Sequence, residues 1–257
     1  MSKKQIFLLC IVVIVIIALG SFLFIKTEEK KSYSLYLFTG ETKMVKWYYN
    51  DSKWYIVNTN EKLSDPFDVY SNGKYVGNYD LVYNNKWYYF DEYNKNVQID
   101  GIKFMINTNY NFTSYAFNVD YKKNDDLAEK LADQLNINYN KFTYNLKTFK
   151  ISNNNKLETI YAVDFYEKDD EYASFGPSYT AVFNILNNKI SIIKYLEFSQ
   201  SNKDYCSLNV DGVFRFENDN NKILLSCTYF DQIPSDYYLY ESNKNNYELI
   251  VDSKGGV

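Results

Sequence analysis

Hydrophobic and polar positions follow three patterns along this chain of 257 residues. Residues Ile6 to Ile25 form an apolar run without a charge. From about residue 33, short runs of apolar and aromatic residues alternate with turns rich in Asn, Asp and Gly, as is typical of β-strands. Only the stretch at about 126–136 repeats its apolar residues at helical spacing. The chain is therefore predicted to be mainly β, with α+β character in the middle.

The uncharged run has the length of a membrane-spanning helix. At about 1.5 Å per residue, Ile6 to Ile25 would form a rod of about 30 Å, which matches the hydrocarbon thickness of a bilayer. We interpret it as a single transmembrane anchor. The alternative is a secretory signal cleaved after Gly20, since Ala18 and Gly20 are small. Against cleavage, the apolar residues Phe22 to Ile25 continue the run beyond that point.

Lysines flank the run on both sides, so charge alone does not fix its orientation. Lys3 and Lys4 precede it, whereas Lys26, Lys30 and Lys31 follow it. A short tail with two lysines is difficult to translocate, while a long carboxy-terminal part follows an anchor readily. We therefore expect a cytoplasmic amino terminus and an extracytoplasmic body in the cell membrane. In this division, residues 1–31 are the tail, anchor and short spacer.

Residues 32–120 are predicted to form an all-β meander module. Turn sequences at 50–52, 71–73 and 84–85 separate pairs of short strands, and Asp65-Pro66 interrupts the run. Almost no helical periodicity is present before residue 120. This pattern predicts antiparallel meanders that close into a sandwich or a barrel-like sheet.

Residues 121–257 are predicted to form an α+β module. Asp126 and Glu129 have the spacing of a capping box, and three leucines follow on one helical face. Four long strand patterns come next, at 142–152, 157–167, 179–186 and 189–198. Beyond residue 205 the pattern predicts further hairpins, including strands 206–210 and 213–217 around a turn at Asp211-Gly212. These hairpins either extend the preceding sheet or form blade-like hairpins.

The composition excludes several kinds of chemistry. The chain contains no histidine, which removes Ser-His-Asp and Cys-His catalysis and histidine-bound zinc. Its single arginine, Arg215, excludes a site that clamps an anionic substrate with several guanidiniums. The sequence has no glycine-rich phosphate loop, which argues against nucleotide chemistry. Glu217, Asp219 and Asn221 alternate as calcium ligands would, but no turn glycine or closing acidic residue accompanies them. We therefore predict no cofactor, no metal site and no catalytic residues.

The balance of charge argues against nucleic acid as a partner. All 32 acidic residues and all basic residues except Lys3 and Lys4 follow the anchor, which gives that part a formal charge of −6. Phosphate binding requires clustered positive charge. The predicted partners are instead the membrane, through Ile6 to Ile25, and a protein or a cell-wall polymer.

Cys206 and Cys227 are the two cysteines outside the anchor and form a candidate disulfide. If strands 206–210, 213–217 and 223–229 form a simple meander, the two cysteines lie two strand spacings apart, about 9 to 10 Å. That distance exceeds the limit of about 7 Å between bonded Cα atoms. A disulfide therefore requires a different strand order, and two buried free thiols are the alternative.

The tryptophans lie in aromatic strand patterns. The segment Asn85-Lys-Trp-Tyr-Tyr-Phe-Asp-Glu-Tyr-Asn-Lys-Asn-Val-Gln-Ile-Asp-Gly101 resembles the aromatic hairpin repeat of choline- and glucan-binding cell-wall modules, and 52–60 resembles it more faintly. In that family, aromatic side chains between hairpins hold the ligand. The resemblance covers about one hairpin and part of another and lacks the glycine after Asn94, so we transfer no site residues from it. The candidate ligand-contact aromatics are Trp47, Trp54, Trp87 and Tyr88, and packing in the core is the alternative.

Two functions remain open from the sequence. The first is a membrane-anchored, extracytoplasmic and non-catalytic binding domain whose exposed tyrosines or tryptophans contact a partner. The second is a surface hydrolase, such as a glycoside hydrolase, that works through two carboxylates. The lack of histidine favours the first. The second requires two carboxylates about 5 to 10 Å apart in a pocket, one of them desolvated.

Overall fold

The computed structural model describes residues 32–39, 43–50, 53–58, 67–79, 81–84, 87–90, 104–108, 111–153, 156–168, 176–198, 205–216, 219–228, 234–243 and 246–253. These residues form antiparallel sheets and one α-helix, which confirms the predicted mainly β fold. The predicted anchor, Ile6 to Ile25, lies outside this described part. Among the described residues, no helix is both long and apolar enough to cross a bilayer.

The first of three large sheets, here called the N-terminal sheet, has the strand order β3-β2-β1-β8-β4-β5. The predicted meander holds for β1, β2 and β3, but β8 pairs with both β1 and β4 and so interrupts the chain order. A separate two-stranded sheet contains β6 and β7. The bounds of these strands are β1 Ser32–Thr39, β2 Lys43–Asn50, β3 Lys53–Asn58, β4 Phe67–Ser71, β5 Lys74–Tyr79, β6 Leu81–Asn84, β7 Trp87–Phe90 and β8 Phe104–Thr108.

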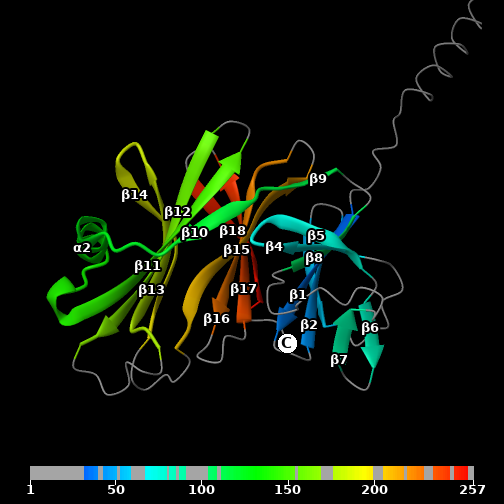
Figure 1. The fold of residues 1–257 in the computed structure, drawn as a ribbon, viewed down its shortest axis with the longest axis horizontal. Helices are drawn as coiled ribbons and strands as arrows, with labels where there is room; N and C mark the ends of the chain where they lie inside the picture. The colour runs from blue at the N-terminus through cyan, green and yellow to red at the C-terminus, as the bar shows by residue number, and fades with distance from the viewer. Residues whose placement is uncertain are drawn as a thin grey trace, which may run out of the picture. The chain divides into compact units, whose positions relative to one another are not determined.

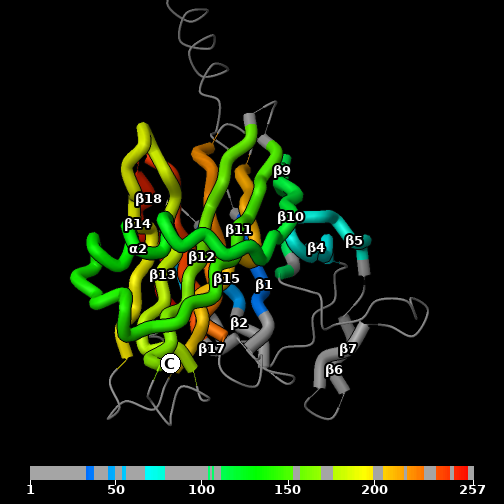
Figure 2. The backbone as a smooth tube through the Cα atoms, turned by 60° about the vertical axis from the view of Figure 1, so that its left-hand side comes forward, coloured from blue at the N-terminus to red at the C-terminus, as the bar shows by residue number. Residues whose placement is uncertain are grey.

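The second, the helix-covered sheet, has the order β10-β11-β12-β13-β14, so its last four strands form the predicted meander. A 3-10 turn, η3, precedes β11, and helix α2 packs on one face of the sheet (Figures 1 and 2). The bounds are β10 Phe117–Asp120, α2 Asp125–Gln134, η3 Tyr139–Lys141, β11 Phe142–Asn153, β12 Lys156–Glu167, β13 Tyr179–Leu186 and β14 Lys189–Glu197.

Helix α2 forms where the leucine spacing predicts it, but its amino-terminal cap differs from the prediction. The side-chain oxygen of Asn124 accepts a hydrogen bond from the Leu127 backbone N–H at 3.1 Å. Asn is a preferred N-cap residue because it satisfies one of the free N–H groups of the first turn. Asp126 and Glu129, the predicted capping box, therefore lie inside the helix. Leu127 and Leu131 are buried against the sheet.

The third, the central sheet, has the order β18-β17-β16-β15-β9. The predicted turn at Asp211-Gly212 is wrong, because β15 continues through these residues with a β-bulge between Val210 and Gly212. The residues from 205 onward thus form a sheet of their own, joined by β9. The bounds are β9 Phe112–Ser114, β15 Ser207–Phe216, β16 Lys222–Thr228, β17 Pro234–Asn243 and β18 Asn246–Asp252.

Both faces of the central sheet are buried. One face contributes Ile223, Leu225 and Tyr238 to a core shared with the helix-covered sheet. The other contributes Leu224 and Leu239 to a core shared with the N-terminal sheet. Strands that are buried on both sides lose the alternation of apolar and polar residues, and β16 is accordingly buried at every position from Lys222 to Cys227.

The segment from β9 to β10 connects two sheets within a few residues. β9 pairs with β15 of the central sheet, whereas β10 pairs with β11 of the helix-covered sheet. The aromatic ring of Phe104, from the N-terminal sheet, lies 5.4 Å from that of Phe214, from the central sheet. Residues on both sides of position 120 thus share a core, and the division of 32–257 near residue 120 stays a prediction.

The turn between β4 and β5 contacts this connecting segment. Asn72 and Gly73 both have positive φ, 49° and 71°, as a two-residue hairpin turn requires. The carbonyl of Asn72 accepts a hydrogen bond from the Phe117 N–H, and the carbonyl of Gly73 accepts one from the Ser114 hydroxyl. A Cβ atom on Gly73 would lie 2.0 Å from the carbonyl oxygen of Tyr115. Gly73 therefore permits both the turn and the close contact.

We expect Gly73→Ala to lower the free energy of unfolding by about 2 kcal/mol or more, because it adds backbone strain and forces Tyr115 away. The measurement is urea unfolding of the full chain in detergent. Asn188→Ala is the matched control, since Asn188 also has positive φ, 63°, but lies exposed in the β13–β14 turn. Equal losses in the two variants would show that the contact with Tyr115 contributes nothing.

Candidate functional site

Two of the four predicted ligand-contact aromatics lie close together. The rings of Trp47 and Trp54 pack edge to face with centroids 6.5 Å apart. Trp47 is fully buried and Trp54 is half-buried, so of this pair Trp54 alone has a surface that a ligand could contact. Trp87 and Tyr88 belong to β7, where only the backbone is described, and their role stays a prediction.

A stack of aromatic rings surrounds Trp54 at the junction of the N-terminal and central sheets. Tyr33 is stacked between Phe216 and Tyr49, with centroids 3.6 Å and 4.6 Å away. Trp54 meets Tyr33 and Tyr49 edge to face, at 5.3 Å and 5.4 Å. Phe216 comes from the central sheet, and the other rings come from β1, β2 and β3. Aromatic packing therefore joins the two sheets here.

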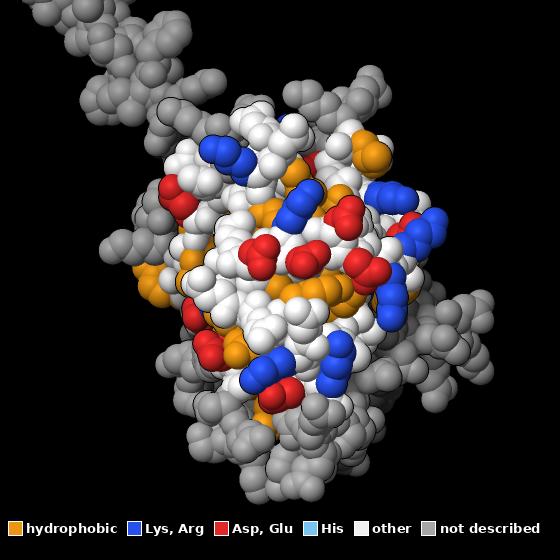
Figure 3. Space-filling view, turned by 90° about the vertical axis from the view of Figure 1, so that its left-hand side faces the viewer, with side chains coloured by type: hydrophobic (Ala, Val, Ile, Leu, Met, Phe, Trp, Pro, Cys, Tyr) orange, Lys and Arg blue, Asp and Glu red, His pale blue; other side chains and the backbone are white. Residues whose placement is uncertain are grey.

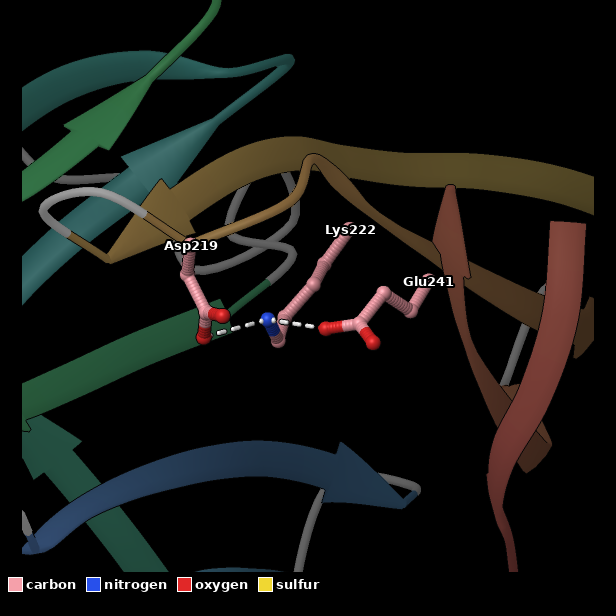
Figure 4. A network of polar contacts seen from close by, with 3 residues as sticks. All are labelled: Asp219, Lys222 and Glu241. Carbon is pink, nitrogen blue, oxygen red and sulfur yellow. Dashed lines mark hydrogen bonds and ion pairs between the residues drawn. The ribbon is translucent and has the colours of Figure 1, made fainter. Parts of the chain in front are cut away.

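A buried lysine lies beside this stack. Lys222 begins β16, and Glu241 is its direct partner on β17. The Lys222 ammonium lies 2.9 Å from an oxygen of Asp219 and 2.8 Å from one of Glu241 (Figure 4). The side chain of Lys222 is only 2% exposed, whereas those of Asp219 and Glu241 are 41% and 31% exposed. A buried ammonium must be paired, and these two carboxylates pair it while they reach solvent.

We call Tyr49, Trp54, Asp219, Lys222 and Glu241 the junction site. Each carboxylate has one oxygen bonded to Lys222, and no hydrogen bond within the described residues occupies the other oxygen. The ammonium also lies 5.9 Å from the centre of the Phe216 ring. The site thus combines half-buried aromatic rings with acceptors held in fixed positions.

Tyr33 shows how the carboxylates act on the aromatic stack. Burial raises the pKa of its phenol well above the ordinary value, and the negative charges of Asp219 and Glu241 raise it further. The phenol therefore stays protonated at all physiological pH values. It is 3% exposed, and no residue in the described part bonds to its hydroxyl. Its O–H remains as a donor beside the junction site.

Asp219, Lys222 and Glu241 were not among the residues predicted from the sequence. Asp219 was considered only as a calcium ligand, and in the structure it pairs with Lys222 instead. The described residues contain no group of three or more Asp, Glu, Cys or His side chains that could hold a metal ion. The only sequence signal for this ion pair is a lysine that directly precedes the apolar run of β16, and strand register is needed to place Glu241 opposite it.

A second polar group lies between the central and helix-covered sheets. Asp164, on β12, is 3% exposed and accepts a hydrogen bond from the Thr180 hydroxyl at 2.7 Å. The Thr180 oxygen in turn accepts one from the Leu208 backbone N–H on β15. Nearby, Lys147 donates to the Asn209 side chain, also across the two sheets. Burial raises the pKa of Asp164, although Lys147 and hydrogen bonds from Thr180 and Ser207 oppose this rise.

The structure joins Cys206 and Cys227 in a disulfide beside this polar group. Their Cα atoms are 5.5 Å apart, within the usual range for bonded cysteines. The spacing predicted from a simple meander is wrong because β15 does not turn at Asp211-Gly212. Leu208 is therefore opposite Cys227 on the adjacent strand β16, and Cys206 lies just before β15.

We expect unreduced chain to resist alkylation at Cys206 and Cys227 and to gain two labels only after reduction, by mass spectrometry. A cross-link over a sequence separation of 21 residues constrains the unfolded chain by about 3 kcal/mol. Replacement of both cysteines by alanine should lower unfolding stability by about that amount. Labelling of both thiols without reductant would contradict the disulfide.

Asp164→Asn should remove a pH-dependent contribution to stability. Because the folded-state pKa of Asp164 is raised, its contribution is fully present below the ordinary pKa of about 3.9 and is lost as pH rises through the folded-state value. The stability of the unmodified chain relative to Asp164→Asn should therefore fall as pH rises above about 4. Urea unfolding at several pH values measures it.

Asp120→Asn is the control for this measurement. A hydrogen bond from Lys150 lowers the pKa of the exposed Asp120, so its contribution should change with pH in the opposite sense. A stability difference for Asp164→Asn that instead rises with pH would show that Lys147 holds Asp164 ionised.

Comparison with protein families, with curated proteins and with solved structures finds no match for this chain. No relative therefore supplies a substrate, partner or site residue by similarity. The function has to be inferred from the chemistry of the groups that the fold brings together. The junction site combines aromatic surface, charge and access to solvent.

Proposed function

We propose that this chain is a membrane-anchored, non-catalytic binding protein whose β-rich body lies outside the cytoplasm and contacts a glycan polymer of the cell envelope. The location is supported by the uncharged run from Ile6 to Ile25 and by the disulfide, which persists in oxidising compartments. The junction site is the proposed binding site.

One observation carries the choice of ligand. The half-buried rings of Tyr49 and Trp54 pack on Tyr33, and the charges of Asp219 and Glu241, which a buried lysine holds in place, act on the same Tyr33. The face of a sugar ring is apolar at its C–H groups and can pack on Trp54 or Tyr49. Its hydroxyls can donate to the second oxygens of Asp219 and Glu241. Because Lys222 already holds both carboxylates in place, little side-chain entropy is lost when the ligand binds.

The same ion pair favours binding over hydrolysis. Asp219 and Glu241 come close enough together for the carboxylate pair of a glycosidase, but the Lys222 ammonium lies between them and bonds to both. A hydrolase needs that space for the glycosidic oxygen or for a water molecule. Asp164 is desolvated, but it is buried between sheets and its pKa is influenced by no second carboxylate. We therefore do not propose hydrolysis.

We expect the full chain in detergent to sediment with insoluble cell-wall glycan and Trp54→Ala to weaken that binding about tenfold or more, since central aromatics carry much of the energy of an interface. The measurement is the fraction of chain that pellets as a function of glycan concentration. Asp219→Asn should weaken binding by a smaller factor, because it keeps the shape but loses a charged acceptor.

Tyr55→Ala is the matched control. Tyr55 follows Trp54 on β3, so its side chain points to the opposite face of the sheet, and it is 48% exposed. Its replacement should leave sedimentation within about twofold. Equal losses for Trp54→Ala and Tyr55→Ala, with both variants folded by circular dichroism, would overturn the junction site. Release of new reducing ends from the glycan would replace the binding proposal with hydrolysis.

A further inference from the structure

Helix α2 covers only part of the outer face of the helix-covered sheet. Its residues Leu127, Leu131 and Ala132 pack on Phe165 and Phe183. Tyr179 and Tyr195, on neighbouring strands β13 and β14, belong to the same face but remain half-buried. Their rings are nearly parallel, with 9° between the planes and centroids 6.3 Å apart. Two aligned tyrosine rings thus lie at the surface beside the helix.

Carboxylates surround this pair of rings. Glu197 is the direct strand partner of Tyr179, and the Tyr195 hydroxyl donates to it at 3.4 Å. Glu167, at the end of β12, and Glu197 together raise the pKa of Tyr179, after the larger effect of burial. The tyrosine hydroxyls therefore stay protonated and neutral while the glutamates supply negative charge.

The exposed side of α2 adds further negative charge on the same face. Asp126, Glu129 and Asp133 are exposed at positions that repeat with the helical period, and Lys130 is the one basic residue within the helix. Figure 3, which views this side of the molecule, shows carboxylates gathered in the middle of the face beside hydrophobic side chains, with most lysines towards the rim. The face is therefore both aromatic and acidic.

We infer that this face, defined by Tyr179, Tyr195, Glu167 and Glu197 and called the acidic tyrosine face, binds an arginine-rich segment of a partner protein. A guanidinium can stack on a tyrosine ring and pair with a neighbouring carboxylate at the same time, which an ammonium does less well. Complementary charge would also guide the approach of a basic segment. The chain has a single arginine, Arg215, and it lies on β15 of another sheet, so a second copy fits this face poorly.

The inference does not depend on the glycan proposal, because the acidic tyrosine face and the junction site lie on different sheets. Loss of one binding activity should leave the other in place. Measurement of both activities on each variant therefore separates failure of one proposal from failure of the other.

The test uses the full chain in detergent and a fluorescent peptide of twelve residues that alternates arginine and serine. Fluorescence anisotropy should show binding at about 0.05 M salt that weakens at about 0.5 M, since surface ion pairs are screened. The double variant Glu167→Gln, Glu197→Gln should weaken binding about fivefold, and Tyr195→Ala about threefold. A glutamate–serine peptide of the same length should not bind.

The matched control is the double variant Asp252→Asn, Glu248→Gln, which removes the same number of charges from β18 of the central sheet. It should leave peptide binding within about twofold. Equal weakening by the two double variants would overturn the inference in favour of attraction to net charge alone. Absence of binding at low salt would overturn it as well.

Self-association in sedimentation that is lost in Glu167→Gln, Glu197→Gln would identify a second copy as the occupant instead. Circular dichroism shows whether each variant is folded. If Tyr195→Ala does not fold, the glutamine variants decide the outcome, because they change only half-buried or exposed side chains.

Discussion

The burial of both faces of the central sheet is the constraint on which the rest of the structure depends. A strand with one solvated face can place polar side chains there, but β16 has no such face. It therefore needs an apolar layer on each side, which the N-terminal sheet and the helix-covered sheet provide. At about 25 cal/mol for each Å² of apolar surface removed from water, both interfaces contribute strongly to stability. Neither outer sheet is dispensable in this arrangement.

The two charged groups buried at the faces of the central sheet are both paired. Lys222 is held by two carboxylates at one edge, and Asp164 is held by Thr180 at the other interface. A buried ion pair adds little net stability, because desolvation offsets the attraction. Its contribution is to fix geometry. At the junction site that geometry is two carboxylates on either side of the Lys222 ammonium, which lies 5.9 Å from the centre of the Phe216 ring.

Local features of the fold could be predicted from the sequence, and features that depend on contacts between distant segments could not. The leucines of α2 and the Asn187-Asn188 turn, with φ of 50° and 63°, follow from local periodicity and turn chemistry. Asp211-Gly212 has an equally strong hairpin signal but forms a bulge. The reason lies elsewhere in the chain: a Cβ on Gly212 would lie 2.6 Å from a ring atom of Phe104. The missing side chain of Gly212 lets Phe104 of the N-terminal sheet pack closely against the central sheet, and no local sequence pattern reveals this contact.

The same limit applies to the sites. Trp54 could be named as a candidate from its aromatic strand, but Asp219, Lys222 and Glu241 come together only through the register of β16 and β17. The predicted disulfide distance was wrong for the same reason, since one misplaced turn shifts every later strand by a position in the sheet. Pairings between strands, and not the strands themselves, are what single-sequence patterns leave undetermined.

The core between the N-terminal and central sheets also constrains how the chain can fold. It brings Tyr33 and Leu35, near the start of the described chain, against Leu239 and Val251, near its end. Contacts of such long sequence separation are slow to form because loop closure precedes any gain from packing. A chain that emerges amino terminus first would therefore expose the apolar face of its first sheet until its last strands had been delivered. The order of the strands makes folding a late and concerted event, during which the nascent chain depends on protection from aggregation.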